Sequence, residues 1–313
     1  MSGALLHSRH RIPGLVNPDI GAFYKLIWIT EWADTDGNFS FYTQKTGENV
    51  YIDFGDGTIG RGNDVHNYAD DSEKTIKVWS TDTFSGLLRI YANSKKGLGT
   101  LPTLTGCTGL TEFGFDGNAH TGSVPSFAES TALTYFNVAN NLLSGTLPSF
   151  ATCVALIQFD LRGNSISSTL PSFDACTPLQ KFYISVNDFT GTLPPFNSCT
   201  ALKEFTIGEN TFSGALPSFS ACTALELFQA HQNGFTSYTS GCFSTQKNLA
   251  QIKLHTNSWN QANVDSCLSD LVDSLGGGRV TCTVELNGAG MAAPSSLTAH
   301  NTLEAAGWTV DVN

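Results

Sequence analysis

The chain has 313 residues, of which 41% are hydrophobic and only 14% are charged. A composition this rich in apolar residues predicts a folded chain with a large core and excludes an intrinsically disordered one. The formal net charge of −11 argues against a protein that binds the phosphate backbone of nucleic acids, because such a protein needs a basic face. We therefore expect no nucleic-acid partner.

The first 20 residues contain one short apolar run, residues 3–6, and basic residues follow it at once. This run is too short for the core of a secretory signal peptide. No stretch of the chain approaches the roughly 18 consecutive apolar residues of a membrane-spanning helix. The sequence thus predicts no recognisable export signal and no membrane insertion. We expect residues 1–20 to form an arm that is ordered only against a partner.

Residues 21–82 contain β-rich runs separated by clusters of Asp, Gly and Asn, which predict a small β-module. The run VYIDFGDGTI, followed by HNYADDSEKTIKVW, resembles the polycystic-kidney-disease-like β-sandwich motif. That resemblance implies a β-sandwich-like module placed directly before a repeat domain, as in bacterial surface proteins. Asp34, Asp36, Asp53, Asp56 and Asp64 are expected in β-turns, where Asp and Gly are favoured; whether they also bind calcium stays open.

Residues 83–259 carry a repeat of fixed period. A Leu-Pro or Val-Pro pair recurs in six copies, with the prolines 23 residues apart, as from Pro102 to Pro125. Counted from each proline, position 8 is always Leu, position 11 always Phe and position 16 always Asn. Positions 11 and 13 lie on one side of a short strand, and stacked coils pair such strands into a parallel sheet at roughly 4.8 Å per step. The Asn is expected in the turn after the strand, bonded to backbone groups of adjacent coils.

The repeat as written in NDFTGTLPPFNSCTALKEFTIGEN resembles the plant-type leucine-rich repeat, with its N-x-φ-S/T-G-x-φ-P signature, where φ is apolar. The resemblance covers about half of the chain. Phe replaces the usual Leu at several positions, which places the chain on an outlying branch. The resemblance implies a curved solenoid that binds partners through a concave sheet.

Five of the eight cysteines occupy position 5 of the repeat, and Ser130 occupies it in the sixth copy. Five equivalent thiols cannot pair off evenly, so the pattern predicts free, buried thiols that pack as small hydrophobes. No C-x-x-C spacing is present, and we expect no metal site and no cofactor.

Residues 260–313 are expected to seal the C-terminal end of the solenoid core, which must be capped. Apolar residues from Val264 to Leu275 follow helical spacing, and a second helical pattern runs from Ser295 to Ala306. Alternating runs at 280–286 and 308–312 predict two strands. The predicted fold class is therefore an α/β solenoid, with a parallel leucine-rich-repeat sheet, a helical C-terminal cap and a small β-module in front. The closing segment LTAHNTLEAAGWTV also resembles the terminal cap of phage-encoded and bacterial repeat proteins.

The outward positions 10, 12 and 14 of the strand segment vary from coil to coil, while the inward positions do not. This contrast predicts a binding surface on the exposed face, although a solvated face without a partner stays a possibility. His231 and His255 should lie side by side there, but three or four ligands would be needed to bind a metal. The residues predicted to bind a partner are Tyr135, Asp160, Arg162, Lys181, Tyr183, Glu204, Gln229, His231, Lys253 and His255.

The chain shows no nucleophile-elbow, zinc-protease or phosphate-loop motif, so the sequence predicts a protein without catalytic residues. The main hypothesis is a bacteriophage virion protein, made in the host cytoplasm, that serves as a tail-fibre, baseplate or capsid-decoration component. It would bind a host protein or glycan through the solenoid and other virion proteins through the arm. The alternative is a bacterial cell-surface or secreted adhesin, and an intracellular scaffold is a third hypothesis.

Overall fold

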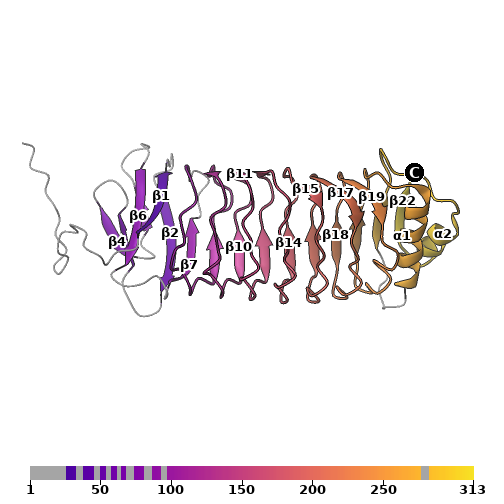
Figure 1. Cartoon of the computed structure of the whole chain (residues 1–313), viewed down its shortest axis with the longest axis horizontal. Coiled ribbons are helices and arrows are strands. Elements are labelled where there is room, and N and C mark those ends of the chain that lie inside the picture. The colour runs from indigo at the N-terminus through magenta and orange to yellow at the C-terminus, as the bar shows by residue number, and fades with distance from the viewer. Residues whose placement is uncertain are drawn as a thin grey trace, which may run out of the picture.

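The molecule is an elongated solenoid whose strands stand side by side along its long axis, with two helices at the C-terminal end (Figure 1). The computed structural model describes residues 26–32, 38–45, 50–53, 58–61, 65–67, 74–80, 87–92, 97–275 and 282–313. The predicted arm, residues 1–20, lies outside the described residues, as do Asp34, Asp36, Asp56 and Asp64. Asp53 was expected in a turn, but it is the last residue of the strand Val50–Asp53.

The main sheet has twelve strands, and nearly all of them pair in parallel with the equivalent strand of the next coil. The register confirms the predicted repeat, because Phe136 aligns with Phe113 on one side and with Phe159 on the other. In sheet order the strands are β22 (Thr309–Val312), β21 (Thr283–Leu286), β20 (Gln251–Lys253), β18 (Leu227–Gln229), β16 (Glu204–Thr206), β14 (Lys181–Tyr183), β12 (Gln158–Asp160), β10 (Tyr135–Asn137), β8 (Glu112–Gly114), β7 (Leu87–Ala92), β2 (Asn38–Lys45) and β5 (Val65–Asn67).

The predicted β-module divides between two sheets. Strands β2 and β5 extend the main sheet, since β2 runs antiparallel to β7. The remaining strands form a four-stranded antiparallel sheet, in the order β1 (Leu26–Trp32), β6 (Lys74–Ser80), β3 (Val50–Asp53) and β4 (Ile59–Arg61). The strand β7 then pairs in parallel with β8, so β7 belongs to the first coil of the solenoid.

A second set of short strands follows the Asn turn of each coil, and these also pair in parallel. They form two three-stranded sheets: β9 (Thr121–Gly122), β11 (Leu142–Gly145) and β13 (Ser165–Ile166), then β15 (Thr190–Thr192), β17 (Thr211–Leu216) and β19 (Gly234–Tyr238).

Two columns of phenylalanine fill the core between the sheets. The strand column, which includes Phe159 and Phe182, stacks along the solenoid with a ring-centroid separation of 5.4 Å for that pair. The second column lies beside it, and Phe173 meets Phe182 edge-to-face at 4.9 Å. Offset-stacked and edge-to-face geometries are the favourable ones for aromatic rings. The rings are fully buried, which confirms that the phenylalanines of the repeat are structural.

The Asn column forms a buried hydrogen-bond ladder. The side-chain amide of Asn210 donates to the carbonyls of Ile207 (3.1 Å) in its own coil and Ile184 (3.0 Å) in the preceding one. Its Oδ1 accepts from the backbone N–H of Phe189, also in the preceding coil, at 3.0 Å. The residue before each Asn adopts a left-handed conformation, with a φ of 56° at Glu209. The Asn therefore satisfies backbone groups that the turn removes from the sheet, as predicted.

The C-terminal cap also agrees with the sequence. The helix α1 (Gln261–Asp273) is capped by the side chain of Asn260, and α2 (Thr298–Ala305) follows β21. Within the cap, the Tyr238 hydroxyl donates to the buried carboxylate of Asp270 at 2.5 Å. This contact fixes α1 to β19 and closes the end of the phenylalanine core.

Replacing Asn210 by Ala is expected to lower the free energy of unfolding by about 2–4 kcal/mol, because it leaves several buried backbone groups without partners. Urea denaturation followed by circular dichroism measures the change. The control is Asn248→Ala, since the exposed Asn248 side chain makes one long contact of 3.5 Å. Equal losses in the two variants would contradict a structural role for the ladder.

His120 stands where the next coil has Leu143, in a fully buried position beside the ring of Phe115. Burial of the imidazole lowers the pKa of His120 to about 4, and the nearby backbone of Gly99 and Leu98 offsets only part of the effect. The native state therefore keeps His120 neutral well below the pH at which the unfolded chain protonates it.

The variant His120→Leu should lose less stability on acidification than the wild type. As the pH falls from about 6.5 to about 4, the unfolded state of the wild type binds a proton that the native state does not, so stability decreases across that window. Urea midpoints measured between pH 7 and pH 4 test this. Identical pH dependence in the two proteins would show that His120 does not cause the loss.

Candidate functional site

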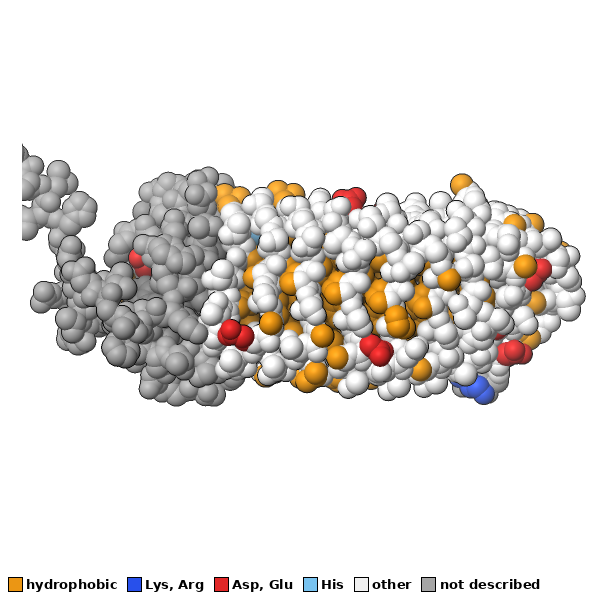
Figure 2. All heavy atoms as spheres, in the orientation of Figure 1, with side chains coloured by type: hydrophobic (Ala, Val, Ile, Leu, Met, Phe, Trp, Pro, Cys, Tyr) orange, Lys and Arg blue, Asp and Glu red, His pale blue; other side chains and the backbone are white. Residues whose placement is uncertain are grey.

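The outer face of the main sheet carries a series of ion pairs, most of which connect neighbouring coils. One face of the coils, by contrast, shows rows of hydrophobic side chains between uncharged ridges and few charged side chains (Figure 2). The predicted binding residues all lie in strands of the main sheet or within two residues after them. The pairs, with their N–O distances, are Arg89–Glu112 (3.1 Å), Arg162–Asp160 (2.7 Å), Lys181–Glu204 (3.2 Å), Lys203–Glu226 (3.9 Å) and Lys253–Glu285 (3.0 Å).

The sequence predicted that position 12 of each coil is exposed, and for four coils this is wrong. Gly114 is buried, and so are three larger residues. Asp160, Tyr183 and Thr206 are exposed by only 2%, 8% and 6%. Their side chains do leave the sheet on its outer face. However, adjacent strands stand only about 4.8 Å apart, so long side chains of the neighbouring coils cover them.

Arg162 and Tyr183 form the most ordered part of this face. The guanidinium of Arg162 donates to both carboxylate oxygens of Asp160, at 3.0 and 2.7 Å, and lies 4.6 Å above the ring centre of Tyr183. The Tyr183 hydroxyl donates in turn to Glu204. The aromatic face is thus stacked against a cation, an arrangement that stabilises both groups.

The titration behaviour of this cluster follows from its packing. Burial and the hydrogen bond to Glu204 raise the pKa of Tyr183 above its usual value. Burial alone would raise the pKa of Glu204, but the hydrogen bonds from Tyr183 and Lys181 outweigh it and lower that pKa. Burial raises the pKa of Asp160, although Arg162 opposes the shift. At neutral pH the Tyr183 hydroxyl is therefore protonated and can donate to Glu204, whose carboxylate is ionised.

His231 and His255 stack on adjacent coils with ring centroids 4.7 Å apart, as their shared position predicted. The Nε2 atom of His231 lies 3.9 Å from Glu209, and that of His255 lies 3.6 Å from Glu285. Burial, and then the neighbouring His255, lower the pKa of His231. The two rings therefore face separate carboxylates, and the described residues contain no group of three or more side chains arranged to hold a metal ion.

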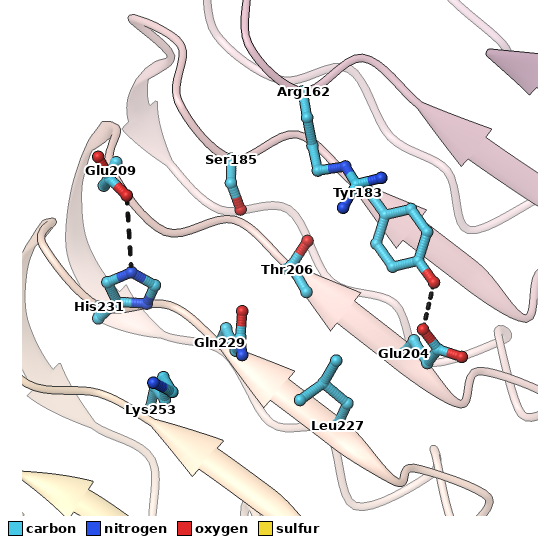
Figure 3. Close-up of a pocket in the computed structure, with 10 residues that line it drawn as sticks. All are labelled: Arg162, Tyr183, Ser185, Glu204, Thr206, Glu209, Leu227, Gln229, His231 and Lys253. Carbon is cyan, nitrogen blue, oxygen red and sulfur yellow. Dashed lines mark hydrogen bonds and ion pairs between the residues drawn. The ribbon is translucent and has the colours of Figure 1, made fainter. Parts of the chain in front are cut away.

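A hollow of about 440 Å³ opens between these two clusters. Arg162 and Tyr183 lie on one side of it, Gln229 and His231 lie on the other, and the short side chain of Ser185 lies between them (Figure 3). The hollow exists because small residues occupy its centre. Its lining residues are Arg162, Tyr183, Ser185, Glu204, Thr206, Glu209, Leu227, Gln229, His231 and Lys253.

A glycine contributes to the shape of the hollow without lining it. At Gly208, a Cβ atom would lie 2.4 Å from the imidazole of His231. A side chain there would therefore push His231 out of its stack with His255. The sequence pattern showed Gly208 only as a variable outward position, and its role depends on contact with the next coil.

The hollow brings together six of the ten predicted residues: Arg162, Tyr183, Glu204, Gln229, His231 and Lys253. Asp160, Lys181 and His255 support it from outside, through contacts with Arg162, Glu204 and His231.

Tyr135 lies apart from the hollow, on β10, where it packs near Tyr91. Sequence reasoning missed four lining residues: Ser185, Thr206, Glu209 and Leu227. The sequence signal that could have indicated the hollow is a run of small residues at outward positions of successive coils.

Comparison with known families explains the solenoid. Residues 103–192 and 194–269 match the BspA type leucine rich repeat region, in six copies, and together these segments make up more than half of the chain. The chain belongs to the BspA-type leucine-rich-repeat family. A search of curated proteins found no match. Leucine-rich-repeat solenoids are typically non-catalytic binding scaffolds that bind proteins or peptides.

Solved structures share the fold of this BspA-type chain. The PEPR1–AtPEP1 complex superimposes with a TM-score of 0.57 at 21% identity, over 69% of this chain and 33% of that one. The ectodomain of the Arabidopsis thaliana receptor kinase GASSHO1/SCHENGEN3 gives a TM-score of 0.47 at 23% identity, over 60% of this chain and 28% of that one. A plant ice-binding protein gives a TM-score of 0.43 at 19% identity, over 54% of this chain and 57% of that one. This chain therefore spans a third or less of the length of the first two of these chains.

The cysteines of this BspA-type solenoid are all free and buried, which confirms the sequence prediction. Burial raises the pKa of Cys153 to about 11 and that of Cys199 to about 12. Since the thiolate is the reactive form of cysteine, these thiols are poor nucleophiles. The Cys199 thiol instead donates to the carbonyl of Phe173 at 3.5 Å, so the column is part of the core.

We expect the cysteines of the native protein to be unreactive toward the thiol reagent dithionitrobenzoate at pH 8. All eight thiols should react once guanidinium chloride unfolds the chain, because access and ionisation then both become normal. The absorbance of the released thionitrobenzoate gives the count. A thiol that reacts quickly in the native state would contradict burial of the column.

Proposed function

We propose that this protein is a binding scaffold of a bacterial cell surface and that the hollow on its strand face contacts a protein or peptide partner. Leucine-rich repeats of the BspA type are typical of bacterial surface proteins, which favours the adhesin hypothesis. Virion attachment and a role for the arm remain predictions. No helix in the described part of the chain is long and apolar enough to cross a membrane.

The observation that supports this proposal best is the hollow itself. It lies on an otherwise regular sheet and combines an aromatic, an apolar and several charged side chains. Its rim residues are already held in place by ion pairs within one coil and between neighbouring coils. Tyr and Arg are the residue types that contribute most at protein interfaces. Prior ordering of such side chains reduces the entropy lost on binding.

A glycan partner fits the same hollow less well. Sugars bind by stacking on an open aromatic face, but the Tyr183 ring is only 8% exposed, and Arg162 lies over it. A polypeptide offers charged and apolar side chains together, which match Glu204, Leu227 and Lys253 around the hollow.

Filling the hollow should abolish partner binding. We expect Ser185→Trp to weaken binding more than tenfold, because the indole would occupy the space between Tyr183 and His231. Binding is measured by biolayer interferometry with peptides selected on the wild-type protein from a surface-displayed library. Thr200→Trp, at an exposed position outside the hollow, serves as the matched control.

Selected peptides that bind the wild type and Ser185→Trp equally well would show that the hollow is not the binding site. The surface location has a separate test. Antibody labelling of intact cells of the source bacterium should detect the protein, and protein confined to the cell interior would contradict that part of the proposal.

A further inference from the structure

We infer that the hollow takes a positively charged side chain of its partner, with an arginine guanidinium as the best fit. This inference rests on the proposed binding function and adds the chemical class of the group that is bound. Its basis is a set of polar atoms around the hollow that have no hydrogen-bond partner among the described residues, together with a carboxylate that no cation faces. The polar atoms are hydrogen-bond acceptors or hydroxyls, and the carboxylate carries an uncompensated negative charge.

The acceptors come from three coils. The Nε2 group of Gln229 donates to Gln251 at 2.7 Å, which leaves the Gln229 oxygen directed toward Thr206 and Ser185 (Figure 3). Thr206 is 6% exposed, and its hydroxyl has no partner. A buried polar group without a partner carries a free-energy cost, which a donor from a bound molecule would remove.

His231 adds another acceptor. Its Nε2 atom faces the carboxylate of Glu209 at 3.9 Å, which favours the neutral tautomer with its proton on Nε2. The Nδ1 atom then bears a lone pair, and it is buried without a hydrogen-bond partner. Protonation of the ring is opposed by burial and by the stacked His255. His231 therefore presents an acceptor on this side and does not neutralise Glu209.

Charge distinguishes a cation from a neutral donor. Among the described residues that line the hollow, Arg162, Glu204 and Lys253 each have an oppositely charged partner on the main sheet. The only such contact of Glu209 is the neutral His231, 3.9 Å away, and the Glu209 side chain is 51% exposed. An incoming cation would meet an available carboxylate there, whereas an anion would meet only cations that are already paired.

A guanidinium suits this arrangement better than an ammonium. It is planar and carries five N–H donors in a fixed geometry, so one group can bond a carboxylate and several neighbouring acceptors at once. Ammonium donors point in three directions from a single atom and keep their hydration more strongly. The hollow, at about 440 Å³, has room for such a side chain above Ser185 and Thr206.

The test uses N-acetyl-arginine amide as the probe and N-acetyl-citrulline amide as its uncharged counterpart of similar shape. Titrations are followed in two-dimensional ¹H–¹⁵N NMR spectra of the whole protein, at the backbone amides of Gly208, Glu209 and His231. We expect the arginine derivative to shift these signals in a saturable way, and the citrulline derivative to bind at least tenfold more weakly.

Two variants of equal charge complete the experiment. Glu209→Gln should weaken binding of the arginine derivative at least tenfold. Glu226→Gln should leave it unchanged, because Glu226 is similarly exposed, at 52%, but lies outside the hollow and pairs with Lys203. Unperturbed spectra elsewhere in each variant establish that it is folded.

The inference is overturned if the arginine derivative does not shift the signals of the hollow, if citrulline binds as tightly, or if both variants weaken binding alike. These results are separable from failure of the proposed function. If Ser185→Trp still abolishes binding of the selected peptides, the site is correct and only the ligand class is wrong. If Ser185→Trp has no effect on those peptides, the proposed function itself fails.

Discussion

The whole solenoid depends on one Asn side-chain amide per coil. Each coil must leave the sheet after three strand residues, and that turn removes backbone N–H and C=O groups from their ladder in the middle of an apolar core. The Asn side chain is short enough to fit the bend and supplies both donors and an acceptor. At Asn187 and Asn210 it reaches the coil before its own as well as its own turn. The same group thus closes one coil and positions the next.

With the turn fixed in this way, the spacing of the strands and of the core side chains follows. Strands stack at the backbone repeat of a parallel sheet, and the phenylalanine rings of Phe136 and Phe159 stack with them at 4.8 Å. A thiol at position 5 fits because the space left between these columns is small. The two ends of such a one-dimensional stack expose apolar core and must be capped. At the C-terminal end, the hydrogen bond from Tyr238 to Asp270 holds the helix α1 over the core.

The inward half of this structure was predictable, and much of the outward half was not. Position 8, position 11 and the Asn column each have the same environment in every coil. The same residue type therefore recurs there in all six copies, and a single sequence reveals it. The cap helices also follow from local spacing. The burial of Asp160 and Tyr183 could not be predicted, because it depends on how long side chains of neighbouring coils fold across them. The N-terminal strands show the same limit, since β2 joins the solenoid sheet through pairing that no local pattern encodes.

The hollow illustrates why function in a solenoid arises between coils. No single repeat contains it: Ser185, Thr206 and Gly208 are unremarkable in their own coils, and the space appears only because they are adjacent. Larger neighbours on both sides then hold their positions through ion pairs and stacking, so the hollow is formed before anything binds. A substitution from Ser to Trp at one outward position would close it without touching the Asn ladder or the phenylalanine columns. The fold therefore tolerates variation in the outward positions that shape the hollow, because the Asn ladder and the phenylalanine columns do not depend on them.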